Sequence, residues 1–446
     1  MQKIKFYPLD ATYKVIDGKP VIHLFGKTTD NKQICVLYDK FEPYFYIIQK
    51  WGFDLISKLK NLAIKKDNET ITILNLEAIK KKYMEKEVTA IKVTVKLPYH
   101  VPIISEEIKN FEGIESINEN DILFVRRFMI DKNIVPLTLC EAEGDFATQK
   151  LKVLAFKAEK IEQFSTETLL KPRILSIDIE TYTPGYKQIE PEKNPIIMMS
   201  FYSEDFKKTV VWKKFHTELD YVEFVDSEQE LINKFKEVVE SYKPDIVAGY
   251  FSDGFDLPYI KARADKHKLK LDLGLDFSEL KIEKRINETA QITGITHLDV
   301  FKFIRKVIAS TLDTDKYNLN AVASEMLDEK KHDADLDALS KVWQEGIESM
   351  DEFVEYCLND SRLCYKLAEK LFPTVSEMVK ITGLTIYDVN RMGFSQLVEW
   401  YLLKQALQFN EIAPNKPDNK ELLKRRSIES KALLYSSQSP DCMKIL

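Results

Sequence analysis

Four carboxylates and a phenol stand where the chain could bring them together around metal ions. Asp178 and Glu180 end an apolar run two residues apart, so on a strand their side chains point to the same side of the sheet. Asp256 follows a second apolar run, and Asp360 lies in mid-helix with Tyr356 one turn before it. Mg²⁺ and Mn²⁺ prefer carboxylate oxygens, and burying such oxygens without a cation is costly. Four acids can hold two ions roughly 4 Å apart, which suits in-line displacement at phosphorus.

Each acid also has a simpler interpretation. Asp178 and Glu180 could be a solvated strand end, and Asp360 could form a salt bridge with a lysine or arginine of the next element. Asp256 precedes Pro258, which fits the first turn of a helix, so Asp256 could merely be the N-cap of that helix. The metal-site interpretation therefore rests on all four acids together. In it, Tyr356 orients the attacking water by a hydrogen bond, and no nucleophilic side chain is needed.

Two buried strands and one long helix would position these residues. The apolar runs at residues 173–180 and 245–250 are predicted strands, and a capping box at residues 227–230 begins a helix that leads into the second of them. A second box, at residues 349–352, begins another helix, which we predict to end near Leu371 because Pro373 follows. One face of that helix carries Phe353, Tyr356, Asp360, Leu363, Cys364 and Leu367.

The rest of the chain indicates a multi-domain α/β (α+β) protein. Residues 1–138 alternate strands with short helices and include a hairpin that turns at Asp17-Gly18. Near Pro136 a stretch with polar and small residues begins, and strands then alternate with helices. We expect a mixed α+β N-terminal domain at 1–138, an α/β domain at 139–372 and a helical extension at 373–446.

Length and composition narrow the class of protein. A chain of 446 residues should form two or three domains, and its apolar and charged fractions are those of a soluble globular protein. With no signal-peptide core and no membrane-length apolar run, we expect a cytoplasmic protein without a membrane partner. Five cysteines without a Cys-x-x-Cys pair argue against disulfides, and six scattered histidines give no zinc pattern.

Charge does not identify the partner. The net charge of −6 is not the footprint of a general nucleic-acid binder. Four basic segments could hold phosphates locally or could simply be solvated faces, and they lie at residues 80–82, 126–127, 281–285 and 424–426.

At this point a family resemblance can be stated. Asp178-x-Glu180, Phe255-Asp256 and Tyr356-x-x-x-Asp360 resemble the three exonuclease motifs of archaeal-type family-B DNA polymerases. Further landmarks follow in the family's order along nearly the whole chain: Gly18-Lys-Pro-Val-Ile, Phe41-Glu-Pro-Tyr-Phe-Tyr46, Ile130-Asp-Lys, Pro195-Ile-Ile-Met, Tyr317-Asn-Leu-Asn-Ala-Val, Leu397-Val-Glu-Trp400 and Ala413-Pro-Asn-Lys-Pro417. The resemblance implies a ribonuclease-H-like 3′–5′ exonuclease domain at 139–372, wrapped by a template-binding N-terminal domain to which the chain returns after about Pro373.

The resemblance also implies an activity and its site. The expected activity is the proofreading hydrolysis of the 3′-terminal phosphodiester of DNA during replication. Two Mg²⁺ or Mn²⁺ ions would be held by Asp178, Glu180, Asp256 and Asp360, with Tyr356 positioning water. A single-stranded 3′ end of a primer–template would stack on aromatic side chains, for which Phe251 and Phe255 are candidates.

A second site is implied in the N-terminal domain, where archaeal relatives capture template uracil. Position by position it maps onto Tyr13, Pro43, Tyr44, Val101, Pro102, Ile122 and Phe124. Leu123 stands where those relatives tend to have proline. From the residues alone, these positions are ordinary core side chains.

Two departures from the family pattern leave alternatives open. Phe251 stands where the family usually has asparagine, which concerns rate or strand positioning more than metal binding. After residue 426 no Tyr-x-Gly-Gly segment and no palm, fingers or thumb follow, so we expect no nucleotidyl-transfer site in this chain.

Polymerase activity would then need a separate polypeptide docked on residues 374–430, with a sliding clamp as a further candidate partner. The chain could instead be a non-catalytic DNA-binding or scaffold subunit. The retention of all four acids argues against that alternative. Either way we expect a cytoplasmic, nucleoid-associated protein.

Overall fold

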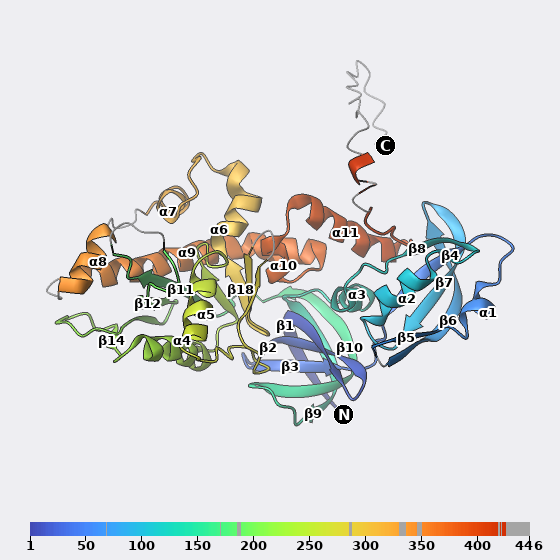
Figure 1. Cartoon of the computed structure of the whole chain (residues 1–446), viewed down its shortest axis with the longest axis horizontal. Coiled ribbons are helices and arrows are strands. Elements are labelled where there is room, and N and C mark those ends of the chain that lie inside the picture. The colour runs from blue at the N-terminus through green and yellow to red at the C-terminus, as the bar shows by residue number, and fades with distance from the viewer. Residues whose placement is uncertain are drawn as a thin grey trace, which may run out of the picture.

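The computed structural model describes residues 1–67, 69–169, 171–184, 189–284, 288–329, 336–345, 350–417, 420 and 422–424. Figure 1 shows an elongated molecule with a β-barrel near its middle, a smaller sheet toward one end and a larger sheet toward the other. The long helix α9 (Asp351–Thr382) runs behind the larger sheet toward the middle of the molecule. The predicted mixed α/β fold class is confirmed.

A closed barrel carries the N-terminus. Its strands run in the order β1-β2-β3-β10-β9. The predicted hairpin joins β1 to β2, and Asp17 and Gly18 have φ values of 50° and 71°, as a two-residue type I′ turn requires. The stretch after Pro136 forms the other two strands, so the barrel combines segments from both sides of residue 138. The bounds are β1 (Gln2–Ile16), β2 (Lys19–Thr28), β3 (Gln33–Tyr38), β9 (Thr138–Ala147) and β10 (Leu154–Thr168).

The smaller sheet has the order β5-β6-β7-β4-β8. Its core joins strand residues such as Ile47 and Val93 to Ile104 on α2. Helix α3 lies between this sheet and the barrel (Figure 1), and its Phe128 packs with Phe6 and Phe156 of the barrel. The bounds are β4 (Tyr44–Gln49), β5 (Ala63–Lys66), β6 (Glu69–Tyr83), β7 (Lys86–Val95), β8 (Ile114–Asn118), α1 (Leu55–Leu59), α2 (His100–Ile108) and α3 (Phe124–Asp131).

The larger sheet has the order β14-β13-β12-β11-β15-β18 and is covered on both faces. From β11, Leu175, Ile177 and Ile179 pack toward α4 and α5, whereas Ile174 packs with residues of α9. Alternation along β11 therefore places Asp178 and Glu180 on the α9 side. The bounds are β11 (Ile174–Thr181), β12 (Ile196–Tyr202), β13 (Lys207–Val211), β14 (Val222–Phe224), β15 (Ile246–Gly249), β18 (Thr296–Asp299), α4 (Glu228–Tyr242) and α5 (Asp256–Lys266).

Helix α9 is longer than the sequence predicts. It continues through Pro373 to Thr382, so the predicted end near Leu371 is wrong. Proline removes one helical hydrogen bond and costs about 3 kcal/mol in a helix interior. Val375 and Val379, both fully buried, continue the apolar face beyond it, and each contributes about 1.5–3 kcal/mol on burial. Ser349, the start of the predicted capping box, lies outside the described residues.

After α9 the chain returns to the smaller sheet through α10 (Ile386–Arg391) and α11 (Phe394–Gln408). The Lys82 amide donates to the Asn410 carbonyl at 2.9 Å, and the Ile412 amide donates to the Lys82 carbonyl at 2.8 Å. The remaining elements are β16 (Lys281–Lys284), β17 (Glu288–Gln291), α6 (Val300–Phe303), a π-helical turn (Ile304–Ile308), a 3-10 turn (Ala309–Thr311), α7 (Leu319–Leu327) and α8 (Leu336–Glu345).

Candidate metal centre

The acidic pair on β11 faces a cysteine of α9. The Cys357 sulfur lies 3.6 Å from Asp178 Oδ2 and 3.9 Å from the Asp178 carbonyl oxygen. One donor atom from each of Asp178, Glu180 and Cys357 lies within 4.8 Å of the others, close enough to share one cation. Burial, together with the charges of Asp178 and Glu180, raises the pKa of the thiol well above its ordinary value. Cys357 is therefore a neutral thiol next to these carboxylates at neutral pH.

Asp256 reaches the same space from the other neighbouring strand. It is the first residue of α5, whose N-cap is Phe255, so the simpler interpretation of Asp256 as an N-cap is not what the structure shows. Its side chain is almost fully buried. Burial raises its pKa to about 7, and the charges of Asp299 and Asp360 act in the same direction. An acid so placed favours a nearby cation.

Asp360 and Tyr356 lie on the buried face of α9, each 8% exposed. Asp360 influences the pKa of both Asp256 and Cys357, and it therefore lies close to the acids of α5 and β11. The structure thus brings together all four predicted acids. Hard oxygen donors from three separate elements fit a divalent ion such as Mg²⁺ or Mn²⁺.

The two candidate DNA-contacting aromatic residues differ in exposure. Phe251 is 46% exposed and its ring meets that of Phe301 edge-on, at a centroid distance of 5.3 Å. Phe255 is half-buried against the core under α5, with its ring 5.3 Å from that of Tyr259. Of the two, Phe251 offers the more accessible ring.

Three residues near the centre were missed from the sequence. They are Asp253, which is fully buried beside Lys302 and Arg391, Asp299, which ends β18, and Cys357, which follows Tyr356. No comparable signal existed for Asp299, because the residues before it, Thr296-His297-Leu298, do not form an apolar run. Cys357 lies one residue from Tyr356 and was not part of the predicted helix face, and a lone cysteine carries no metal signal by itself.

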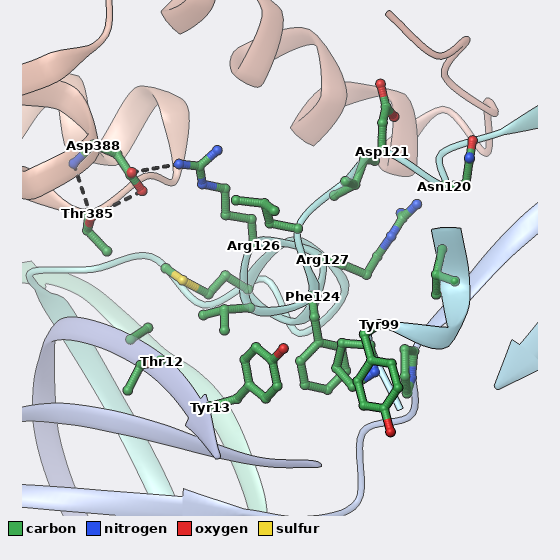
Figure 2. Close-up of a pocket in the computed structure, with 18 of the residues that line it drawn as sticks. Thr12, Tyr13, Tyr99, Asn120, Asp121, Phe124, Arg126, Arg127, Thr385 and Asp388 are labelled. Atoms are coloured by element: carbon green, nitrogen blue, oxygen red, sulfur yellow. Dashed lines mark hydrogen bonds and ion pairs between the residues drawn. The ribbon is translucent and has the colours of Figure 1, made fainter. Parts of the chain in front are cut away.

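The residues mapped onto a uracil pocket line one cavity of about 500 Å³ beside α3, which lies far along the molecule from β11 (Figure 1). All seven are part of its wall: Tyr13, Pro43, Tyr44, Val101, Pro102, Ile122 and Phe124. Figure 2 shows Tyr13 and Phe124 facing each other, and their ring centroids are 5.3 Å apart. The cavity also reaches Asp388 of α10, which pairs with Arg126 at 2.7 Å.

Of the four basic segments, the one at residues 126–127 makes ion pairs within the protein. Arg127 is buried against Glu119, and Arg126 pairs with Asp388. Arg285, Arg425 and Arg426 lie outside the described residues. Among the described residues, none of the helices has both the length and the apolar character that a membrane span requires.

Comparison with known proteins shows which family a large segment of this chain resembles. Residues 115–322 match the family "DNA polymerase family B, exonuclease domain". That segment of the chain is therefore similar to the exonuclease domains of family-B DNA polymerases, and it contains Asp178, Glu180 and Asp256 but not α9.

The chain as a whole is similar to archaeal family-B polymerases. A DNA polymerase of Pyrococcus glycovorans is 35% identical over 94% of this chain and 49% of its own length. A DNA polymerase of Thermococcus gorgonarius is 32% identical over 94% of this chain and 49% of its own length. The chain spans about half the length, or less, of the curated relatives it matches.

A solved structure shares the fold. The family B DNA polymerase of Pyrobaculum calidifontis superposes with a TM-score of 0.80 at 23% identity, over 93% of this chain and 52% of that chain.

Proposed function

We propose that this chain is a divalent-metal-dependent 3′–5′ exonuclease unit of a family-B DNA polymerase, which removes nucleotides from the single-stranded 3′ end of DNA. One observation carries the proposal: carboxylates from β11, α5 and α9 gather in one region, where Asp178 and Glu180 lie within 4.8 Å of Cys357 on α9 and the charge of Asp360 acts on both Asp256 and Cys357. The exonuclease-domain match supports it independently.

The chain's own residues have distinct parts in this reaction. Asp178, Glu180, Asp256 and Asp360 bind the cations, which supply charge stabilisation at the phosphate and an activated water. Tyr356, one turn from Asp360 on α9, orients that water through its phenol. The exposed ring of Phe251 stacks on a terminal base, because single-strand binding rests largely on stacking and phosphate contacts.

A nuclease assay on 3′-labelled single-stranded DNA, with and without Mg²⁺, tests the proposal. The expected result is metal-dependent release of mononucleotides that Asp178→Ala abolishes. Asp220→Ala, which changes an exposed acid of the same sheet region, is the matched control and should keep wild-type activity. Full activity in Asp178→Ala would refute the site, and a wild-type chain without activity that still binds DNA would favour the scaffold alternative.

We also propose that the cavity of about 500 Å³ binds a uracil base of a template strand. The supporting observation is that seven residues from four separate segments, mapped from the family pattern alone, line one cavity. Uracil and thymine differ by one methyl group, which a shaped pocket distinguishes by about 10- to 200-fold.

Oligonucleotides that carry deoxyuridine or thymidine at one position measure this preference. Filling the cavity with Val101→Trp should abolish it, whereas Phe146→Ala, at an exposed ring of β9 outside the cavity, should leave it intact. Equal affinity of the wild-type chain for the two oligonucleotides would contradict the proposal.

A further inference from the structure

The turn at residues 250–256, which leads from β15 to Asp256, holds a strained aromatic residue. Phe251 has a φ of 65°, in the left-handed region. A non-glycine residue there costs about 1–3 kcal/mol and persists only where its surroundings enforce it. Its ring lies so close to Gly254 that an added Cβ would come within 2.4 Å of it. Contacts from outside the turn must therefore hold this conformation, and with it the position of Asp256.

Asp299, at the end of β18, makes the first of these contacts. Its carboxylate accepts hydrogen bonds from the Phe251 amide at 3.2 Å and the Asp253 amide at 3.0 Å. Asn390 of α10 in turn holds the backbone of Asp299. Its Nδ2 donates to the Asp299 carbonyl at 2.8 Å, and its Oδ1 accepts from the Asp299 amide at 3.2 Å. The turn is thereby tied to α10.

Asp253 makes the second contact from inside the turn. Its fully buried carboxylate accepts from the Ala290 amide at 2.7 Å, Arg391 Nη2 at 2.9 Å and Lys302 Nζ at 2.8 Å. Burial alone would raise the pKa of Asp253, but a hydrogen bond from His297 and the charge of Arg391 lower it far below its ordinary value. Asp253 is therefore a charged anchor at neutral pH.

Arg391, the last residue of α10, connects this anchor to its surroundings. Its guanidinium also donates to the His297 carbonyl at 3.1 Å and lies 3.8 Å from the centroid of the Tyr387 ring. A planar fork can make these contacts at once, which the single ammonium of lysine cannot. Arg391 lies outside the matched segment 115–322.

We propose that Arg391 is a positioning residue for the nuclease reaction: by pairing with buried Asp253 it fixes the turn that delivers Asp256 to the metal centre. The inference rests on the proposed function. Removing a residue that supports metal ligands typically weakens metal binding by about 10- to 100-fold. Helix α10 would thus complete a site whose ligands lie on other elements.

The test compares Arg391→Ala and Arg391→Lys with a matched control. Lys27→Met breaks another buried ion pair, with Asp245 at 2.8 Å, next to the opposite end of β15. Two quantities are measured where all proteins are folded. Amide hydrogen exchange of a peptide covering residues 250–256 reports whether the turn is held, and the paramagnetic resonance of free Mn²⁺ reports metal affinity.

Arg391→Ala should speed exchange in that peptide and weaken Mn²⁺ binding by about 10- to 100-fold, with Arg391→Lys intermediate and Lys27→Met unchanged in both. Unchanged exchange in Arg391→Ala overturns the inference, as does faster exchange with unchanged Mn²⁺ affinity. An equal loss in Lys27→Met also overturns it, because the effect would then be general destabilisation. Wild-type protein that binds no Mn²⁺ would contradict the proposed function itself, and this result is distinct from the outcomes for the variants.

Discussion

Replacing Asp256 by asparagine should stabilise the metal-free protein at pH 8. Asp256 is buried beside Asp299 and Asp360, and its pKa rises from 3.8 to about 7. Between these two pH values the folded chain keeps the Asp256 proton while the unfolded chain has released it. The free energy of unfolding therefore falls as pH rises through this window. At 1.36 kcal/mol per pH unit, the interval corresponds to about 4 kcal/mol.

Thermal unfolding in EDTA measures the effect. Asp256→Asn and wild type should unfold at similar temperatures near pH 4, and the variant should gain up to about 4 kcal/mol by pH 8, roughly 5 °C in Tm. Mn²⁺ should reverse the order at pH 8, because a ligand that binds only the folded wild type stabilises it.

Asp253→Asn supplies a control with the opposite sign. The pKa of Asp253 is lower in the folded protein than in the unfolded chain. The charged carboxylate therefore stabilises the folded protein at every pH above the unfolded pKa, including pH 8. This variant should be less stable than wild type at that pH. If Asp256→Asn were also less stable in EDTA at pH 8, Asp256 would not be the desolvated, repelled acid that the structure describes.

Three further variants test other parts of the account. Tyr356→Phe should keep Mn²⁺ affinity but lower the nuclease kcat by about 100-fold, since it removes only the phenol that positions water; equal losses of both would assign Tyr356 a structural role. Phe251→Ala should weaken single-stranded DNA binding by about 1–3 kcal/mol in a fluorescence anisotropy titration, and unchanged affinity would exclude stacking on that ring. Phe124→Ala, which opens the wall of the cavity, should reduce any preference for deoxyuridine without changing nuclease activity, and a nuclease loss would show that the cavity and the metal centre are not separate.

The convergence of the acids could be predicted because it depends on local periodicity. The alternation of β11 puts Asp178 and Glu180 on one face, and the helical spacing of α9 puts Tyr356 and Asp360 on another. Both patterns depend only on residues that are close together in the sequence. Their meeting in one place was expected only from the family resemblance, which implies a ribonuclease-H-like exonuclease domain.

What could not be predicted depends on contacts between distant segments. Pro373 looked like a helix end because the burial of Val375 and Val379 against the core is invisible in the sequence. Asp253 was missed because its partners, Lys302 and Arg391, lie 49 and 138 positions away. The barrel was missed for the same reason, since β1 and β3 close it only with strands that follow Pro136.

Diffraction from crystals soaked in Mn²⁺ tests the central claim most directly. Anomalous difference maps should show two peaks, roughly 4 Å apart, among the carboxylates of Asp178, Glu180, Asp256 and Asp360. Maps without peaks at these carboxylates, with Asp360 turned toward a lysine or arginine instead, would contradict the account.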